Sequence, residues 1–275
     1  MEYIAPTRLD DALAARRAGA SIVAGGTDWF PAKGEAPFSG TLLDITRIEG
    51  LRGITTDAAG IRIGAATTWS EVIRADLPSA FDGLKAAARE IGAVQIQNAG
   101  TVAGNLCNAS PAADGIPPLL ALDATVELAG PEGTRRLTLP DFVTGVRRTA
   151  LEAGEIVTAI HVPTPEAAVR SAFVKLGARR YLVISIVMVA VQLSLRAGRV
   201  HDVRIAVGAA SPVARRLQEL EAALEGLALA DLPVAITPDR IAGLAPIDDI
   251  RADAAYRREA VPEAIRRALQ LAGGD

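Results

Sequence analysis

Apolar residues recur with a helical period at the start of the chain and then as short strand-like runs. Residues 7–19 are predicted to form a helix that begins after Thr7 as N-cap and ends at Gly19. Residues 21–24 and 41–46 are apolar runs of the length typical of buried strands. The chain therefore begins as strand, turn, segment and strand, in a βαβ-like unit.

The next segment alternates and then becomes helical. Residues 51–68 read as a hairpin, and Thr68 with Glu71 three positions later forms a capping box for a helix that ends near residue 75. A second helix is predicted at 79–91. Beyond it we expect a short helix at 117–122, a strand at 125–129, a turn followed by a strand within 130–140, and a strand at 155–162.

Proline and glutamate residues at 163–170 resemble a linker and predict a domain boundary there. The segment that follows is rich in strand patterns. We expect strands at 171–176, 183–195 and 199–207, helices at 215–230 and 260–271, and a short helical turn at 239–243.

Composition excludes several classes of function. The 275 residues are 50% hydrophobic with a net charge of −3, so the chain is globular and carries no basic stripe for nucleic acid. A single cysteine excludes an internal disulfide framework and an iron–sulfur or zinc site held by cysteines of this chain alone. The two histidines have no ligand-spaced partner, so no metal site is expected.

No secretory signal pattern occurs at the N-terminus, and the longest apolar run, at 181–195, is shorter than the roughly 20 residues needed to span a bilayer. These features predict a cytoplasmic protein without a transmembrane segment.

Two polar, glycine-containing stretches stand out. The longer, QIQNAGTVAGNLCNASPAAD, occupies residues 95–114, and the shorter, AGGTD, occupies residues 24–28. Glycine frees backbone N–H groups to approach an anion, so the pair suits the pyrophosphate of a dinucleotide, although surface loops share this composition. Neither stretch has the spacing of the Rossmann fingerprint or the Walker motif, which disfavours Rossmann-type nicotinamide binding and nucleotide hydrolysis.

These two stretches resemble the FAD-binding motifs of the medium, flavoprotein subunits of the molybdenum hydroxylase family, of the carbon monoxide dehydrogenase and xanthine dehydrogenase type. The likeness extends over essentially the whole chain, including LDI at 43–45 and IGAATT at 63–68. It implies an α+β fold: a two-subdomain FAD-binding domain of the vanillyl-alcohol-oxidase (PCMH) type and a smaller C-terminal domain with an antiparallel sheet packed on helices. The expected boundaries are 1–168 (subdomains about 1–55 and 56–168) and 169–275.

The resemblance also implies roles for individual residues. The first motif would wrap the FAD pyrophosphate and ribityl chain, the second would form another phosphate loop, Asp114 and Lys175 would lie near the flavin, Ile91 would contact it, and Val157 would contact the adenine side. The implied cofactor-binding set is Ile22, Val23, Ala24, Gly25, Gly26, Thr27, Asp28, Trp29, Ile91, Thr101, Val102, Ala103, Gly104, Asn105, Asp114, Val157 and Lys175.

Each role has a purely structural alternative. The two aspartates can cap helices or form turns, Lys175 can be a solvated strand residue, and Ile91 and Val157 can be core residues. Cys107 is expected to be a small buried residue without a redox role.

The implied activity is electron transfer. FAD on this chain would take electrons from iron–sulfur clusters of a small partner subunit and pass them to an external acceptor, while a large partner subunit holds the molybdopterin. A dimer of heterotrimers is the expected assembly, and no side chain here need act as a catalytic acid or base. Some NAD-reducing relatives carry acidic residues where this chain has Leu182 and Val183, which argues against NAD as acceptor.

Two other functions fit the residues less well. A stand-alone FAD-dependent reductase of related fold needs a proton donor and a basic substrate site in the second domain. Only the pairs Arg179-Arg180 and Arg215-Arg216 suggest one. A non-enzymatic interaction protein that has lost the cofactor is disfavoured by the intact glycines and Asp114.

Overall fold

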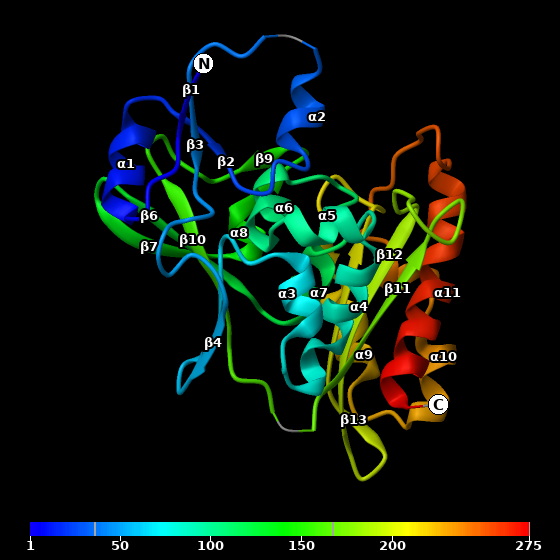
Figure 1. Ribbon diagram of the computed structural model, residues 1–275. Coiled ribbons are helices and arrows are strands. Elements are labelled where there is room, and N and C mark those ends of the chain that lie inside the picture. The colour runs from blue at the N-terminus through cyan, green and yellow to red at the C-terminus, as the bar shows by residue number, and fades with distance from the viewer. Residues whose placement is uncertain (36, 167, 275) are drawn as a thin grey trace.

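The computed structural model describes residues 1–35, 37–166 and 168–274. The chain begins with a small parallel sheet, in which β3 (Thr41–Asp44) lies between β1 (Glu2–Ile4) and β2 (Ser21–Val23). Helix α1 (Leu9–Arg17) covers this sheet at the left of Figure 1. The short helix α2 (Trp29–Lys33) follows the glycine turn after β2.

The second sheet is antiparallel and has the strand order β4-β5-β10-β6-β7. Its two hairpins follow from turn residues between strand-forming segments, and β10, which is buried along nearly its whole length, joins them in the middle. The strands are β4 (Ile54–Asp57), β5 (Gly60–Gly64), β6 (Thr125–Gly130), β7 (Gly133–Thr138) and β10 (Ile156–Val162). A two-stranded ribbon, β8 (Val143–Gly145) with β9 (Arg148–Thr149), was not predicted.

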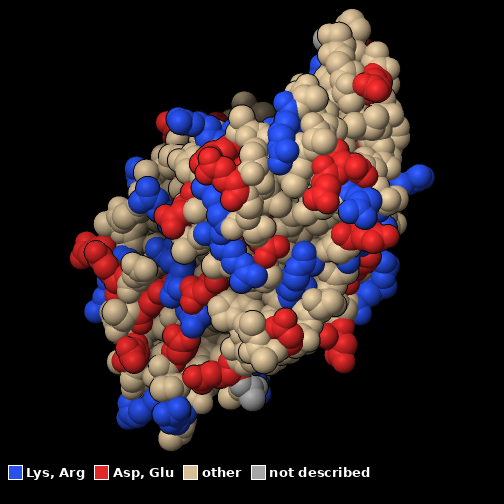
Figure 2. Space-filling view, turned by 90° about the vertical axis from the view of Figure 1, so that its left-hand side faces the viewer, with Lys and Arg blue, Asp and Glu red and all other residues tan. Residues whose placement is uncertain are grey.

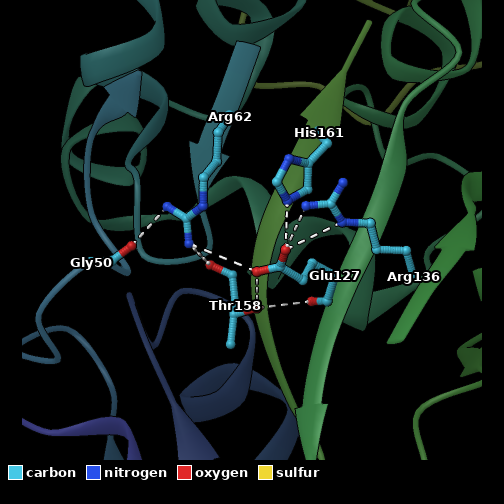
Figure 3. A network of polar contacts seen from close by, with 6 residues as sticks. All are labelled: Gly50, Arg62, Glu127, Arg136, Thr158 and His161. Carbon is cyan, nitrogen blue, oxygen red and sulfur yellow. Dashed lines mark hydrogen bonds and ion pairs between the residues drawn. The ribbon is translucent and has the colours of Figure 1, made fainter. Parts of the chain in front are cut away.

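One face of this sheet carries a cross-strand polar cluster centred on Glu127 (Figure 3). Its carboxylate accepts a hydrogen bond from Thr158 Oγ1 at 2.8 Å, and its Oε2 atom lies 2.8 Å from His161 Nε2 and 3.0 Å from Arg136 Nη2. Arg62 Nη2 is 4.0 Å from Oε1. These hydrogen bonds lower the pKa of Glu127 although its partial burial opposes the shift.

The segment between the two hairpins of this sheet is helical and supplies much of the core. It comprises the 3₁₀ turn η1 (Ser79–Phe81) and the helices α3 (Trp69–Arg74), α4 (Asp82–Glu90), α5 (Val94–Ala99), α6 (Val102–Asn108) and α7 (Ile116–Ala121), with α8 (Leu139–Phe142) after β7. The predicted capping box at α3 is confirmed: Thr68 and Glu71 exchange both hydrogen bonds. The side chains of Trp69, Phe81 and Leu84 are fully buried beneath these helices.

The C-terminal segment forms a four-stranded antiparallel sheet, β11-β12-β13-β14, covered on both faces (Figure 1). Alternate residues of β12 face opposite sides: Met188 and Ala190 join the core beneath α7, while Val187, Val189 and Val191 join the core beneath α11. The elements are β11 (Arg170–Leu176), β12 (Val187–Arg196), β13 (Arg199–Gly208), β14 (Arg215–Arg216), α9 (Gln218–Leu224), η2 (Leu229–Asp231), α10 (Leu232–Ala235), η3 (Pro238–Ile241) and α11 (Ala254–Gly273).

Three sequence expectations about helices were wrong. The helix predicted at 215–230 is much shorter, because Arg215 and Arg216 pair with β13 as a strand and the chain turns extended at Glu225 and left-handed at Gly226. Helix α1 begins after Arg8, without a side-chain cap from Thr7. Helix α11 begins six residues before the predicted start, where Asp253 caps it by accepting a hydrogen bond from Tyr256 N.

The glycine-containing stretch 95–114 is largely helical. It folds into α5 and α6, with Thr101 as N-cap of α6 because its Oγ1 accepts a hydrogen bond from Gly104 N at 3.0 Å. The predicted strand at 183–195 begins only at Val187, and the residues before it form an irregular connection. The predicted linker at 163–170 includes residue 167, which lies outside the described residues.

Charged side chains of both signs are interspersed on the face shown in Figure 2, which is the left-hand side of Figure 1. This face therefore lacks the one-sign surface typical of nucleic-acid-binding proteins. None of the helices within the described residues has the length and apolar character that crossing a lipid bilayer requires.

Candidate cofactor-binding site

A cavity of about 510 Å³ lies between the N-terminal parallel sheet and the helical segment α4–α6. This volume is within the range of small-molecule and cofactor sites. Its walls come from both glycine-containing stretches together with residues of α1, α3 and β10 and with Ile45, which directly follows β3. Segments more than 70 residues apart in sequence thus form one site, as the adjacency of β2 and α6 in Figure 1 also shows.

The glycine turn after β2 requires its glycines. A Cβ atom on Gly25 would lie 1.9 Å from the carbonyl oxygen of Ala99, so only glycine permits the backbones of the two stretches to touch. Gly26 has φ +70°, and a Cβ there would lie 2.7 Å from the ring of Phe30. The turn therefore places bare backbone at the cavity wall, where N–H groups can face a phosphate.

The second stretch is held in place by backbone hydrogen bonds to the residues that precede α3. Trp69 N donates to Gly100 O at 3.1 Å, and Val102 N donates to Thr67 O at 3.0 Å. These contacts fix Gly100 and Thr101 at the cavity, with the side chain of Trp69 beside them. The indole of Trp69 is only 1% exposed, so this wall is packed directly on the core.

Asn105 presents an unfilled acceptor at the cavity. Its Oδ1 atom is buried and has no hydrogen-bond partner in the part of the chain that the structure describes. The adjacent Gly115 is packed so tightly that a Cβ there would lie 2.4 Å from the Trp69 ring and 2.8 Å from Asn105 Oδ1. Since a buried acceptor without a donor is costly, this oxygen fits a ligand that carries hydroxyl donors, such as the ribityl chain of a flavin.

The structure brings most of the predicted site residues together at this cavity. Its walls include Ile22, Val23, Ala24, Gly25, Gly26, Thr27, Asp28, Trp29, Ile91, Thr101, Ala103, Gly104, Asn105 and Val157. Three predicted residues do not line it. The side chain of Val102 is fully buried in the core, and those of Asp114 and Lys175 are buried without lining the cavity.

Asp114 and Lys175 instead form a buried ion pair between the two halves of the chain. Lys175 Nζ, on β11, lies 2.7 Å from Asp114 Oδ2, and it also donates to Glu90 O at 3.2 Å. Ser185 donates a hydrogen bond to the other carboxylate oxygen. Burial raises the pKa of Asp114, and the ammonium of Lys175 and the Ser185 hydroxyl offset part of that rise.

Cys107 corrects a sequence expectation. It was predicted to be buried, but its side chain is exposed because it faces the open cavity. Protein atoms surround the sulfur on its other sides, and this crowding raises the pKa of the thiol to about 12.

Several wall residues were missed by sequence reasoning, among them Arg16, Ile45, Trp69, Ile96, Asn108 and Leu151. Arg16 had the appearance of a solvated residue in the last turn of a surface helix, and Trp69 that of a core residue after an N-cap. A local pattern has no signal for which face of α1 meets a cavity made by later strands.

Fold and cavity together define a site for an extended, partly anionic dinucleotide.

The comparisons with known proteins identify the family. Residues 1–165 match the family model described as the FAD binding domain in molybdopterin dehydrogenase, and residues 172–272 match the CO dehydrogenase flavoprotein C-terminal domain. The chain belongs to this family of oxidoreductase flavoprotein subunits and carries its FAD-binding domain. The predicted family, fold class and cofactor are therefore confirmed.

Named relatives agree with this assignment. The chain is 33% identical to the xanthine dehydrogenase FAD-binding subunit of Escherichia coli O157:H7, over 85% of this chain and 82% of that protein. It is 36% identical to the nicotinate dehydrogenase FAD-subunit of Eubacterium barkeri over 68% of this chain, and the match spans only 66% of that relative. Among solved structures, a carbon monoxide dehydrogenase from Hydrogenophaga pseudoflava that lacks the Mo-pyranopterin moiety matches with TM-score 0.90 and 31% identity, covering 99% of this chain and 96% of the other.

Proposed function

We propose that this chain is the FAD-binding electron-transfer subunit of a multi-subunit molybdenum-containing dehydrogenase. The observation that carries the proposal is the contact of the two glycine-containing stretches at Gly25 and Ala99, which forms one continuous cavity wall from two distant segments. When bound, the flavin supplies the transfer of electrons from iron–sulfur clusters of a partner chain to an external acceptor.

The residues of this chain bind and orient the cofactor in this proposal. The backbone of the turn at Gly25 and Gly26, with the hydroxyls of Thr27 and Thr101, faces the pyrophosphate. Asn105 accepts from a ribityl hydroxyl through its unpartnered oxygen. Ile91 and Val157 both line this cavity and supply apolar contacts, Ile91 to the flavin and Val157 to the adenine side in this proposal.

In this proposal Asp114 and Lys175 support the cavity without contacting the cofactor. Their ion pair joins the turn after α6 to β11, and Lys175 also bonds to Glu90 O, next to Ile91. The pair therefore supports the segment that carries Ile91 at the cavity. The connection between β11 and β12, which contains Tyr181, Leu182 and Ile184, starts from the same strand and exposes these three apolar side chains.

We infer that the partners are a molybdenum-cofactor large subunit and an iron–sulfur small subunit, assembled with this chain as a dimer of heterotrimers in the cytoplasm. The support is the likeness to relatives named as FAD-binding subunits and medium chains. The exposed apolar residues Tyr181, Leu182 and Ile184 favour a protein surface that meets another chain.

The test is a flavin titration of the purified chain. We expect the chain to bind FAD, with quenched flavin fluorescence and a perturbed absorbance spectrum. If no binding occurs even after reconstitution with excess FAD, the proposal fails. Co-expression with the neighbouring genes is expected to yield a complex that contains molybdenum and iron. A monomeric flavoprotein that reduces a substrate without partners would instead favour the stand-alone reductase.

A further inference from the structure

Arg16 is a cavity residue whose hydrogen-bonding capacity is only partly used. It lies in the last turn of α1, and its Nη1 donates to Ala20 O at 3.0 Å. Its Nε atom is buried and has no hydrogen-bond partner, and no carboxylate within residues 1–35, 37–166 and 168–274 forms an ion pair with it. Among the described side chains that line the cavity, Arg16 is the one permanent cation and Asp28 the one carboxylate.

The cavity has two distinguishable ends. Ile45 and Ile156 pack in one core cluster with Ala12 and Leu13 of α1, so they mark the end of the cavity where Arg16 lies. Ile91 packs against the separate core cluster that contains Trp69 and Leu84, and it marks the other end of the cavity. The glycine turn that follows β2 lies between α1 and the helices α5 and α6, as Figure 1 shows.

The chemistry at the α1 end suits an aromatic base with acceptor atoms on its edge. Aliphatic side chains such as Ile45 and Ile156 offer flat apolar contact, and an unfilled guanidinium N–H requires an acceptor. Adenine has both properties, because its ring nitrogens N1, N3 and N7 accept hydrogen bonds. The backbone turn at Gly25 and Gly26 already suits the phosphates, which leaves the guanidinium for the nucleoside.

We propose that Arg16 binds the adenosine half of FAD and thereby makes the site selective for FAD over FMN. This inference rests on the proposed function and adds a residue to it. The guanidinium of Arg16 donates to the adenosine, while its Nη1 bond to Ala20 O keeps the side chain oriented along the cavity wall.

The test compares Arg16→Met and Arg16→Lys with the matched control Arg17→Met. Arg17 is exposed, occupies the same last turn of α1 and does not line the cavity, so Arg16→Met and Arg17→Met each remove one positive charge from the same helix end. Dissociation constants for FAD and FMN are measured by fluorescence titration of the apoproteins. Displacement of FAD by AMP is measured in parallel, and melting temperatures of the apoproteins report on folding.

For Arg16→Met we expect FAD affinity to fall about tenfold to a hundredfold, the effect of losing a hydrogen bond from a charged donor. FMN affinity should change less than about twofold, and the inhibition constant of AMP obtained from the displacement should rise by about the same factor as the dissociation constant of FAD. Arg16→Lys keeps the charge without the planar fork and should fall between the wild type and Arg16→Met. Arg17→Met should bind like the wild type.

Two results overturn the proposal while leaving the proposed function intact. Equal losses of FAD and FMN affinity would place Arg16 at a phosphate, and unchanged FAD affinity would remove Arg16 from the binding site. Failure of the wild type to bind any flavin is a different outcome, because it refutes the proposed function itself. If Arg16→Met does not fold, Arg16→Lys tests the same selectivity.

Discussion

Breaking the buried ion pair between Asp114 and Lys175 should strongly destabilise the protein. The side chain of Lys175 is 5% exposed and that of Asp114 is 8% exposed, so water cannot replace a lost partner. Replacing Lys175 by Met leaves the carboxylate facing only the Ser185 hydroxyl. Removing one partner of a buried pair costs about 3–5 kcal/mol of unfolding free energy.

The assay is urea unfolding of the apoprotein, followed by tryptophan fluorescence and circular dichroism. A loss of 3–5 kcal/mol corresponds to a melting temperature lower by roughly 6–20 °C in a chain of this size. The matched control is Asp10→Asn, which breaks the exposed pair of Arg8 and Asp10 and should cost at most about 1 kcal/mol. Use of the apoprotein separates the effect from any loss of FAD.

The double variant Lys175→Met with Asp114→Asn tests the reasoning further. It removes both charges, so it should recover most of the stability lost by Lys175→Met. The pKa of Asp114 is raised by burial, and a carboxyl with a raised folded-state pKa contributes most to stability at low pH. The penalty of Lys175→Met should therefore shrink as the pH falls and Asp114 takes up a proton. A single-variant loss below about 1 kcal/mol, or a double variant no more stable than the single one, would refute this reasoning.

Three other outcomes follow from the geometry. Gly25→Ala should weaken FAD binding severely, because the new Cβ would meet Ala99 O at 1.9 Å, whereas Gly243→Ala, with open space around it, should bind FAD normally in the same titration. Glu127→Gln should destabilise the protein near neutral pH by about 1–3 kcal/mol. Because the pKa of Glu127 is lowered in the folded protein, the stability that its carboxylate adds over glutamine should vanish as the pH falls below about 4. Equal losses of stability at pH 7 and pH 3 in urea titrations would contradict this. Cys107, whose pKa is raised to about 12 by desolvation, should react with iodoacetamide at pH 8 more slowly than a free thiol, as measured by mass spectrometry, and reaction at the rate of free cysteine would contradict the raised pKa.

Local patterns predicted the parts of the fold that depend on neighbouring residues. The capping box of Thr68 and Glu71 is a contact across three residues, and it formed as expected. The strand β10 was predicted from its alternating pattern with nearly the observed bounds. The stretch 95–114 was less predictable, because Gly, Asn and Ala have no strong periodicity and the helices there depend on the Thr101 cap and on packing against Trp69.

Helix length was the least reliable expectation where two patterns competed. Residues 215–230 have leucines at helical spacing, yet Arg215 and Arg216 join β13 and only Gln218–Leu224 is helical. Arg216 also bonds to Glu221 and Asp123, so tertiary ion pairs favour the strand at this position. A local pattern does not contain the energy of such distant contacts.

The sequence by itself determined the apolar periodicity, the caps and the two glycine-containing stretches, and these identified the family and the cofactor. The tertiary structure alone decided that Gly25 meets Ala99, that Asp114 pairs with a lysine 61 residues away, and that Arg16 and Cys107 face the cavity. The physical reason is that a residue's own type and near neighbours set its backbone preference, whereas its partners depend on how the sheets and helices pack.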